Sequence, residues 1–357
     1  MNNEIKTLTG LRGLAALTVM LYHFLERDEY FQYYVPSIIK RGYLGVDVFF
    51  VLSGFVLALS YAWYFENGVS FEHYKTFVLK RLARIYPLYF VITVIFIFRY
   101  MYLNGHWIGN YHLLACALLI QAWGFGLSSV AAATWSLSTE FFAYIIFPVV
   151  VFFAVFARPA YAVGLFALSV AFLCVVASSR LGVNGPLDVV SWSSILPILR
   201  CLAGFCLGLL GYRLSQVNAC RKFLSSPAVV IALMIGLLLA AHFEAHDLIL
   251  FAFFPLIVLT IFYESTAARV IFANRATYHL GVVSYSLYLV HPLFVPVKAD
   301  VEPILERHIG NFAHSLTLVA VTLLSWGFAC ALYRFVEMPG RLFVQRVFLR
   351  PRAMQAP

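Results

Sequence analysis

The sequence contains few charged residues. Only 11% of its 357 residues are Asp, Glu, Lys or Arg, whereas soluble domains carry about 25%. Hydrophobic residues make up 62% of the chain, and the mean hydropathy is +0.87. These values exclude a soluble globular enzyme and predict a polytopic membrane protein. The 25 Lys and Arg outnumber the 16 Asp and Glu, and we attribute this excess to basic cytoplasmic loops rather than to nucleic-acid binding.

Several other features are also missing. The six cysteines form no CxxC pair, so they are predicted to be packing thiols, and no strong motif indicates a metal or a redox cofactor. No small-residue cleavage site follows the first apolar run, which is typical of an uncleaved first span rather than of a signal peptide. No internal repeat is visible, which weakly disfavours transporters built from inverted repeats.

Eleven apolar stretches approach the length of about 20 residues that crosses a hydrocarbon core of roughly 30 Å. They fall at residues 8–25, 43–64, 85–103, 111–127, 135–156, 160–178, 192–212, 228–243, 247–263, 279–297 and 313–336. Basic segments should all face the cytoplasm, so an even number of crossings must separate them. These segments lie at residues 75–84, 213–222, 269–275 and 341–352. Stretch 111–127 is the weakest candidate because it is short and holds His112 and Gln121, so we predict a partial or re-entrant segment there.

The expected fold is an all-α, polytopic membrane helix bundle with about ten transmembrane helices and one partial segment. Residues 1–340 are predicted to form the membrane domain, and residues 341–357 a basic cytoplasmic tail. Both termini are expected in the cytoplasm, and the chain is expected to be a multi-pass protein of the inner (plasma) membrane. The loops are too short for a separate soluble domain, so any chemistry must take place within the bundle.

Arg12 and His23 lie in the first span. A charge near the bilayer centre costs about 2.5–3.5 kcal/mol, so each ionisable residue within a span is a candidate functional residue. Eleven residues at about 100° and 1.5 Å each place the two side chains on one helix face, about 16 Å apart along the axis. An arginine that snorkels to the interface and a hydrogen-bonded core histidine would explain the same spacing.

Three further groups of polar residues interrupt or border apolar stretches. Asp47 and Ser53 are expected to be buried in the second span, among glycines that permit close helix packing. Arg81 and Arg84 lie one helical turn apart before the third span, where two guanidinium groups can hold a phosphate from two directions. Ordinary anchoring by positive charge explains this pair equally well. Glu140 begins an otherwise apolar helix, which is also a plain helix-start signal.

Aromatic residues and a second histidine accompany these groups. Trp135 precedes Glu140 on the chain, and Tyr285 lies two turns before His291 in a late span. Aromatic residues near span ends are commonly interface anchors. A hydrogen-bonded core histidine would explain His291.

Together these segments resemble acyltransferase family 3, whose integral membrane members include O-acetyltransferases of bacterial cell-surface sugars and of other hydroxylated substrates. The resemblance covers nearly the whole chain. It rests on R-x10-H at residues 12–23, G-x-x-G-V-x-x-F-F-x-x-S-G-F at 42–55, R-x-x-R at 81–84, W-S-L-S-x-E at 135–140 and S-Y-x-x-Y-x-x-H at 284–291. Some relatives carry a fused esterase-like domain after the last span, whereas this sequence ends at Pro357, so we expect transfer to be completed in the bundle or by a separate partner.

The resemblance implies an acyl-CoA donor, usually acetyl-CoA, on the cytoplasmic side, where Arg81 and Arg84 would pair with its phosphates. His23 would be the general base toward the acceptor hydroxyl or a transient acyl carrier. An unperturbed imidazole, with a pKa of about 6.5, suits proton transfer at neutral pH. Glu140 would orient His23 or stabilise its imidazolium, and Arg12 would neutralise donor charge or the developing oxyanion.

Asp47, Ser53, Trp135, Tyr285 and His291 are predicted to bind substrate, with the two aromatic residues lining a tunnel. The expected acceptor is a glycan or a lipid-linked sugar at the lipid bilayer, and no metal is expected. The alternative is a multi-span transporter or flippase in which the same buried ionisable groups form a substrate or proton pathway. The acceptor's identity, the acyl chain length and the oligomeric state stay open.

Overall fold

The computed structural model describes residues 4–28, 31–127, 131–310 and 312–349, which form helices and connecting turns without a strand among them. The helices are α1 (Lys6–Leu25), α2 (Phe31–Tyr34), α3 (Ser37–Lys40), α4 (Gly45–Tyr61), α5 (Phe71–Asn104), α6 (Asn110–Leu118), α7 (Trp135–Val151), α8 (Pro159–Ser178), α9 (Leu196–Ser215), α10 (Asn218–Leu224), α11 (Pro227–His242), α12 (Asp247–Phe262), α13 (Thr266–Phe272), α14 (Arg275–Val282), α15 (Ser284–Val290), α16 (Phe294–Ile309), α17 (Phe312–Leu332) and α18 (Met338–Phe348). The predicted all-α architecture is therefore confirmed.

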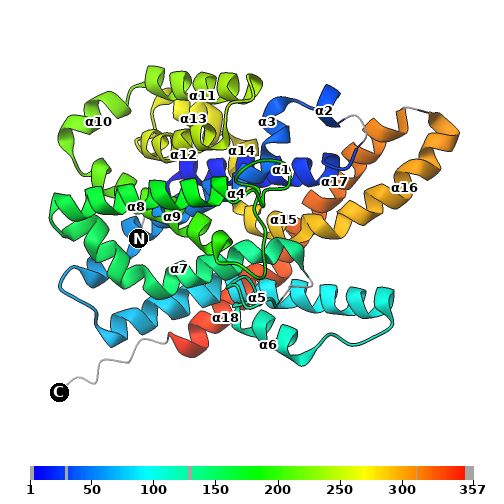
Figure 1. The fold of residues 1–357 in the computed structure, drawn as a ribbon, viewed down its shortest axis with the longest axis horizontal. Coiled ribbons are helices and arrows are strands. Elements are labelled where there is room, and N and C mark those ends of the chain that lie inside the picture. Colours follow the sequence, from blue (N-terminus) through cyan, green and yellow to red (C-terminus); the bar gives the residue numbers. More distant parts are fainter. Residues whose placement is uncertain (1–3, 29–30, 128–130, 311, 350–357) are drawn as a thin grey trace.

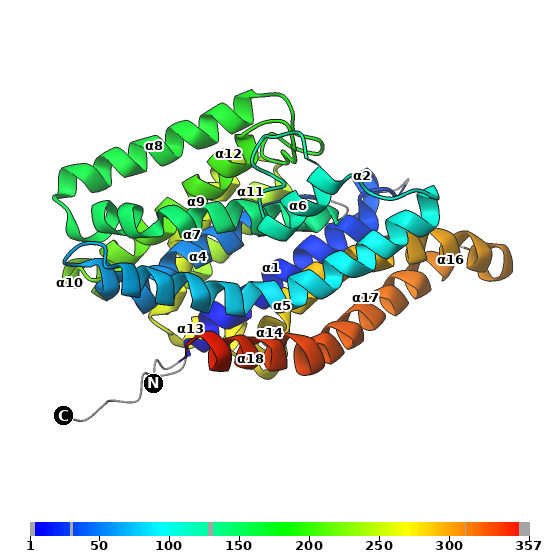
Figure 2. The same cartoon turned by 90° about the horizontal axis from the view of Figure 1, so that it is seen from below.

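The long helices form one bundle. Figures 1 and 2 show α5, α7, α8 and α9 running roughly side by side, with α1 and α4 inside the bundle. In Figure 2, α10 lies at the left end, and the far end of α16 lies at the right end. Since α1 runs from the left half of that view toward α2, Arg12 and His23 lie at different depths of the bundle.

Seven helices or helix runs within the described ranges are long and apolar enough to cross a membrane. Two bent pairs raise this number to nine if each forms one span; their bends are 110° between α12 and α13, and 61° between α14 and the α15–α16 run. The 16-residue α11 is apolar but shorter. Seven to nine candidate spans agree with a polytopic protein, and the expected number of about ten depends on counting α11 as a span.

Stretch 111–127 forms a partial helix, as predicted. Helix α6 has only nine residues, and it ends where Leu119 adopts a left-handed conformation with φ 59°. The chain then returns against the start of α7, where the Ser138 hydroxyl donates to the Leu119 carbonyl at 2.8 Å and accepts from the Ala122 amide at 3.1 Å. These bonds satisfy backbone groups that a helix end would otherwise leave unpaired inside the bundle.

The centre of the bundle is held by direct backbone packing between α4 and α9. A Cβ atom at Gly54 would lie 2.0 Å from the Phe205 carbonyl oxygen, and one at Gly208 would lie 2.1 Å from the Val51 carbonyl oxygen. No other residue type fits these positions without moving a helix, because real Cβ atoms do not approach a carbonyl this closely. Small residues therefore place α4 against α9, the arrangement typical of close helix pairs in membranes.

The predicted boundary after residue 340 falls inside a helix. A π-type turn, Tyr333–Glu337, joins α17 to α18, and α18 continues to Phe348 and packs against α5. Thus the first part of the predicted basic tail, residues 341–348, belongs to the helical bundle. Residues 350–357 of that tail lie outside the described residues.

Candidate active site

A cavity opens between α1, α4, α5, α7 and α15. It encloses about 670 Å³ of unoccupied space, counting the part that opens to solvent. Six of the ten predicted site residues line it: Arg12, Ser53, Arg81, Arg84, Glu140 and Tyr285. Hence all five sequence motifs, which lie far apart on the chain, contribute residues to one cavity, which we call the arginine cavity.

The guanidinium groups of the arginine cavity are held in different ways. Arg81 donates to the Tyr144 hydroxyl at 3.1 Å and lies over that ring, with its central carbon 5.0 Å from the ring centroid. The Arg84 Nη1 atom lies 2.6 Å from the Glu337 carboxylate. Arg12 makes no hydrogen bond or salt bridge among the residues that the structure describes. One guanidinium is therefore left to meet a ligand.

Two carboxylates balance part of this positive charge. Glu140 accepts a hydrogen bond from Ser53, and Glu337 accepts from Ser286 at 2.7 Å. Three arginines against two carboxylates leave the site with a net positive charge at neutral pH, so it favours an anionic ligand. Glu337 is a site residue that the motifs missed; its position at the end of the last span, next to a basic segment, was its only signal.

His23 lies away from the arginine cavity, deeper along α1. Its Nδ1 atom lies 2.9 Å from the Val19 carbonyl oxygen, one turn earlier. In the neutral ring this contact assigns the proton to Nδ1 and leaves the Nε2 lone pair free. The Val19 carbonyl therefore orients the His23 ring. Glu140, which was expected to do so, bonds Ser53 in the arginine cavity instead, and no carboxylate contacts the His23 ring within the described residues.

His291 lies beside His23. The two ring centroids are 5.0 Å apart, with an angle of 42° between the ring planes. His291 is fully buried, and neither of its ring nitrogens has a hydrogen-bond partner in the described part of the chain. Tyr288, which lines the arginine cavity, lies one turn earlier with its ring 5.7 Å from that of His291. The two predicted histidines are thus adjacent, and one aromatic residue connects them to the cavity.

Asp47 and Trp135 form a separate buried cluster with an arginine that the motifs missed. Arg200 on α9 donates to Asp47 through Nε at 2.8 Å and through Nη2 at 2.6 Å, and Nη2 also reaches the Tyr43 carbonyl at 3.1 Å. The Arg200 guanidinium lies 5.4 Å from the Trp135 ring centroid. Neither Asp47 nor Trp135 lines the arginine cavity. The signal for Arg200 was a lone charge inside apolar stretch 192–212.

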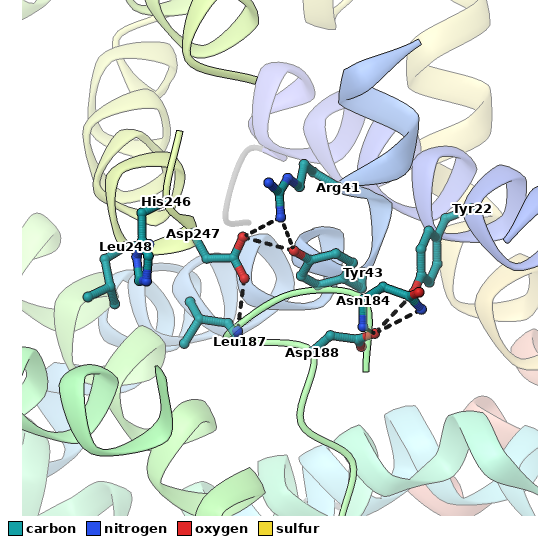
Figure 3. A network of polar contacts seen from close by, with 9 residues as sticks. All are labelled: Tyr22, Arg41, Tyr43, Asn184, Leu187, Asp188, His246, Asp247 and Leu248. Carbon is teal, nitrogen blue, oxygen red and sulfur yellow. Dashed lines mark hydrogen bonds and ion pairs between the residues drawn. The ribbon is translucent and has the colours of Figure 1, made fainter. Parts of the chain in front are cut away.

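Two acidic residues fasten the loop between α8 and α9 to the bundle, as Figure 3 shows. Asp247 accepts from the Tyr43 hydroxyl at 2.8 Å, from the Leu187 amide at 2.8 Å and from Arg41 at 3.2 Å. Asp188 accepts from the Tyr22 hydroxyl at 3.0 Å. Burial lowers the pKa of Arg41, but its bond to Tyr43 and the charge of Asp247 outweigh this and raise the pKa above its ordinary value.

One group of possible metal ligands occurs within the described residues: Asp28, Glu302 and His314. The buried Lys298 ammonium lies 2.6 Å from Asp28 and 2.7 Å from Glu302. A lysine already supplies the positive charge that these two carboxylates need. The cluster is therefore a salt-bridge network that joins the segment after α1 to α16 and α17.

The fold and the site together define a helix-bundle protein with a positively charged cavity and two adjacent histidines, an arrangement suited to group transfer from an anionic donor. Residues 5–334 match the family model described as an acyltransferase domain. The chain therefore belongs to acyltransferase family 3, and the resemblance seen in the motifs is confirmed. No solved structure matches the chain.

Two curated relatives extend this finding. The chain is 25% identical to peptidoglycan O-acetyltransferase OatA of Listeria monocytogenes over 94% of its length, which corresponds to 56% of that protein. The chain is also 35% identical to acyltransferase MdmB of Streptomyces mycarofaciens. This match covers 41% of the chain and 38% of MdmB. The chain thus spans only about half the length, or less, of these curated relatives.

Proposed function

We propose that this chain is an integral membrane O-acetyltransferase. It moves an acyl group, in the simplest case acetyl, from cytoplasmic acyl-CoA to a hydroxyl group of a glycan or a lipid-linked sugar. The observation that carries this proposal is the arginine cavity, which lies on the same face of α1 as His23. Family membership and the O-acetyltransferase relative support the enzyme over a transporter or flippase.

The spacing along α1 suits the shape of the donor. Coenzyme A carries its phosphates at one end of a long flexible arm and the thioester at the other end. Arg12 lines the cavity, and His23 follows eleven residues later on the same continuous helix, about 16 Å along the axis. The phosphates would pair with Arg12, Arg81 and Arg84, while the thioester end reaches toward His23. Charge-assisted bonds from guanidinium to phosphate are among the strongest hydrogen bonds in proteins.

His23 acts as the general base in this scheme. Its Nε2 lone pair is free, because Nδ1 lies against the Val19 carbonyl, and an oriented imidazole with a free nitrogen can take the proton of an acceptor hydroxyl. Glu140 balances the charge of the arginines, since it lines the same cavity and accepts a hydrogen bond from Ser53 there. Asp47 and Trp135 position α4 and α7 through Arg200 rather than touching substrate.

The proposed topology has about ten spans and both termini in the cytoplasm of the inner membrane. Supporting this, α10 with its basic residues lies at one end of the bundle, and the charged cluster around Lys298 lies on α16, which reaches the opposite end. The donor would enter from the α10 end, and the acceptor would approach from the α16 end. Transfer would then carry the acyl group across the bundle.

The proposal is tested with purified protein in lipid nanodiscs, using acetyl-CoA as donor and soluble peptidoglycan fragments as the acceptor probe. Release of CoA thiol and binding of CoA by calorimetry are measured for the wild type, His23→Ala and the double variant Arg81→Ala/Arg84→Ala. We expect His23→Ala to abolish continuous release of CoA thiol, beyond a single turnover, with donor binding intact. The double variant should weaken donor binding at least about 100-fold, since hydrogen bonds to charged groups contribute roughly 1.5–3 kcal/mol each.

Lys75→Ala is the matched control, because Lys75 is an exposed cation on the same helix as the arginine pair. It should leave binding unchanged. If the wild type binds no CoA and releases none from acetyl-CoA, the proposed function is wrong and the arginine pair is a topological anchor.

A further inference from the structure

His291 is the one fully buried histidine of the described residues, and both its ring nitrogens lack a hydrogen-bond partner there. The carbonyl groups of Leu287 and Tyr288, one turn earlier, approach the ring without hydrogen-bond geometry. A neutral imidazole always carries one N–H, and an unpaired buried N–H costs free energy. An imidazole acylated on one nitrogen carries no N–H. The surroundings of His291 are therefore better matched to an acylated ring than to the free one.

His23 and His291 have different surroundings, and these indicate different functions for the two residues. His23 is partly exposed and has an oriented ring with a free Nε2 atom, as a general base requires. His291 has no orienting partner in the described structure, but it lies one turn beyond Tyr288, which lines the arginine cavity. Tyr288 is therefore a lining residue of the cavity whose ring contacts that of His291.

We propose that His291 is the acyl carrier of a two-step transfer, with His23 as the general base of the second step. This inference rests on the proposed function and assigns the intermediate within it. In the first step the unprotonated nitrogen of His291 attacks the thioester carbonyl carbon, and the carbon–sulfur bond breaks. The proton of the other ring nitrogen goes to the departing thiolate, which leaves as CoA thiol.

The second step restores the enzyme. The acceptor hydroxyl gives its proton to His23 Nε2, its oxygen attacks the acyl carbon, and the carbon–nitrogen bond breaks. His23 then passes the proton to the released nitrogen of His291, whose ring lies 5.0 Å away between centroids. The sum of both steps is acyl-CoA plus alcohol giving ester plus CoA thiol, with no proton gained or lost.

The packing around the pair favours a short acyl group. Side chains next to the two histidines on α1 and α15 leave almost no exposed surface: Met20 is 0%, Leu287 is 1% and Phe24 is 2% exposed. A longer acyl chain on His291 would have to displace these side chains, because protein interiors are packed at crystal-like density. An acetyl group requires the least displacement.

Isotope exchange tests the intermediate without any acceptor. A two-step enzyme equilibrates labelled CoA with acetyl-CoA on its own, whereas a one-step enzyme requires the acceptor to be bound. We expect wild-type protein in nanodiscs to catalyse this exchange, His291→Gln to lose it by more than about 100-fold, and His23→Gln to retain it within a few-fold. Both variants should lose overall transfer to peptidoglycan fragments by about 100-fold or more.

Three further measurements separate chemistry from folding. His308→Gln is the matched control, since His308 is an exposed histidine on the neighbouring helix and should leave exchange unchanged. CoA binding by calorimetry should be unaltered in His291→Gln, which shows that the arginine cavity is intact. Added imidazole should restore part of the exchange in His291→Ala, which a purely structural histidine would not allow.

The inference is overturned if wild-type protein transfers acetyl groups but shows no exchange without acceptor. It is also overturned if exchange requires His23 and not His291, because His23 would then be the carrier. A wild type that binds no CoA and releases none from acetyl-CoA refutes the proposed function itself, so the two failures are distinguishable.

Discussion

Replacing Asp47 by leucine should destabilise the protein more than any single change at the arginine cavity. Asp47 is 0% exposed and Arg200 is 1% exposed, and the two share a bidentate contact at 2.8 and 2.6 Å. In Asp47→Leu the guanidinium stays buried without its counter-charge, which typically costs about 3–5 kcal/mol. Since each 1.4 kcal/mol is a factor of about ten, the ratio of folded to unfolded protein should fall by roughly two to four powers of ten.

The assay is thermal unfolding in detergent, followed by tryptophan fluorescence. At about 2 °C per kcal/mol, Asp47→Leu should lower the midpoint by roughly 6–10 °C. The double variant Asp47→Leu/Arg200→Met should recover most of this loss, because apolar residues can replace a buried ion pair at little cost. Asp300→Leu, an exposed position on α16, is the control and should shift the midpoint by only about 1 °C.

Two results would refute this reasoning. A loss below about 1 kcal/mol in Asp47→Leu would mean that Arg200 finds water or another partner once the carboxylate is gone. A double variant that is as unstable as the sum of its single changes would mean that the two residues do not act as a pair.

Two glycine substitutions give further tests. Gly54→Ala should lower the unfolding midpoint by several degrees, because its Cβ would lie 2.0 Å from the Phe205 carbonyl oxygen, whereas Gly327→Ala, with nothing within 4 Å, should be neutral or slightly stabilising; equal midpoints would contradict the close packing of α4 and α9. Gly185→Ala should detach the loop between α8 and α9, because the added Cβ would lie 1.8 Å from the Tyr43 hydroxyl oxygen. Limited proteolysis should then cut this loop faster than in the wild type, and an unchanged cleavage rate would argue against the network in Figure 3.

Local patterns were enough to place much of the candidate site. The eleven-residue spacing predicted that Arg12 and His23 share one helix face, and α1 is continuous over both residues. The one-turn spacing of Arg81 and Arg84 puts both on the wall of one cavity. The weak apolar stretch 111–127 was expected to be partial, and α6 ends after nine residues. Helical periodicity and hydropathy decide such features, and both act over a few turns of one helix.

These local patterns did not predict which distant residues pair with each other. Asp47 pairs with Arg200, which lies 153 residues away in the sequence, and Arg84 pairs with Glu337, which lies 253 residues away. Nothing in the spacing of the motifs indicated that Val19, rather than Glu140, would orient His23. A charge inside a span must find a partner, but hydropathy does not say which helix supplies it.

The sequence by itself determined that this chain is a helical bundle rich in apolar spans, and which ionisable residues interrupt those spans. It also determined the family, because five motifs in order specify it. Only the tertiary structure decided that six predicted residues share one cavity and that His23 meets His291 rather than Glu140. The reason is physical: apolar length and helical period are local properties of the chain, whereas contacts between side chains depend on how α1, α7 and α15 pack against one another.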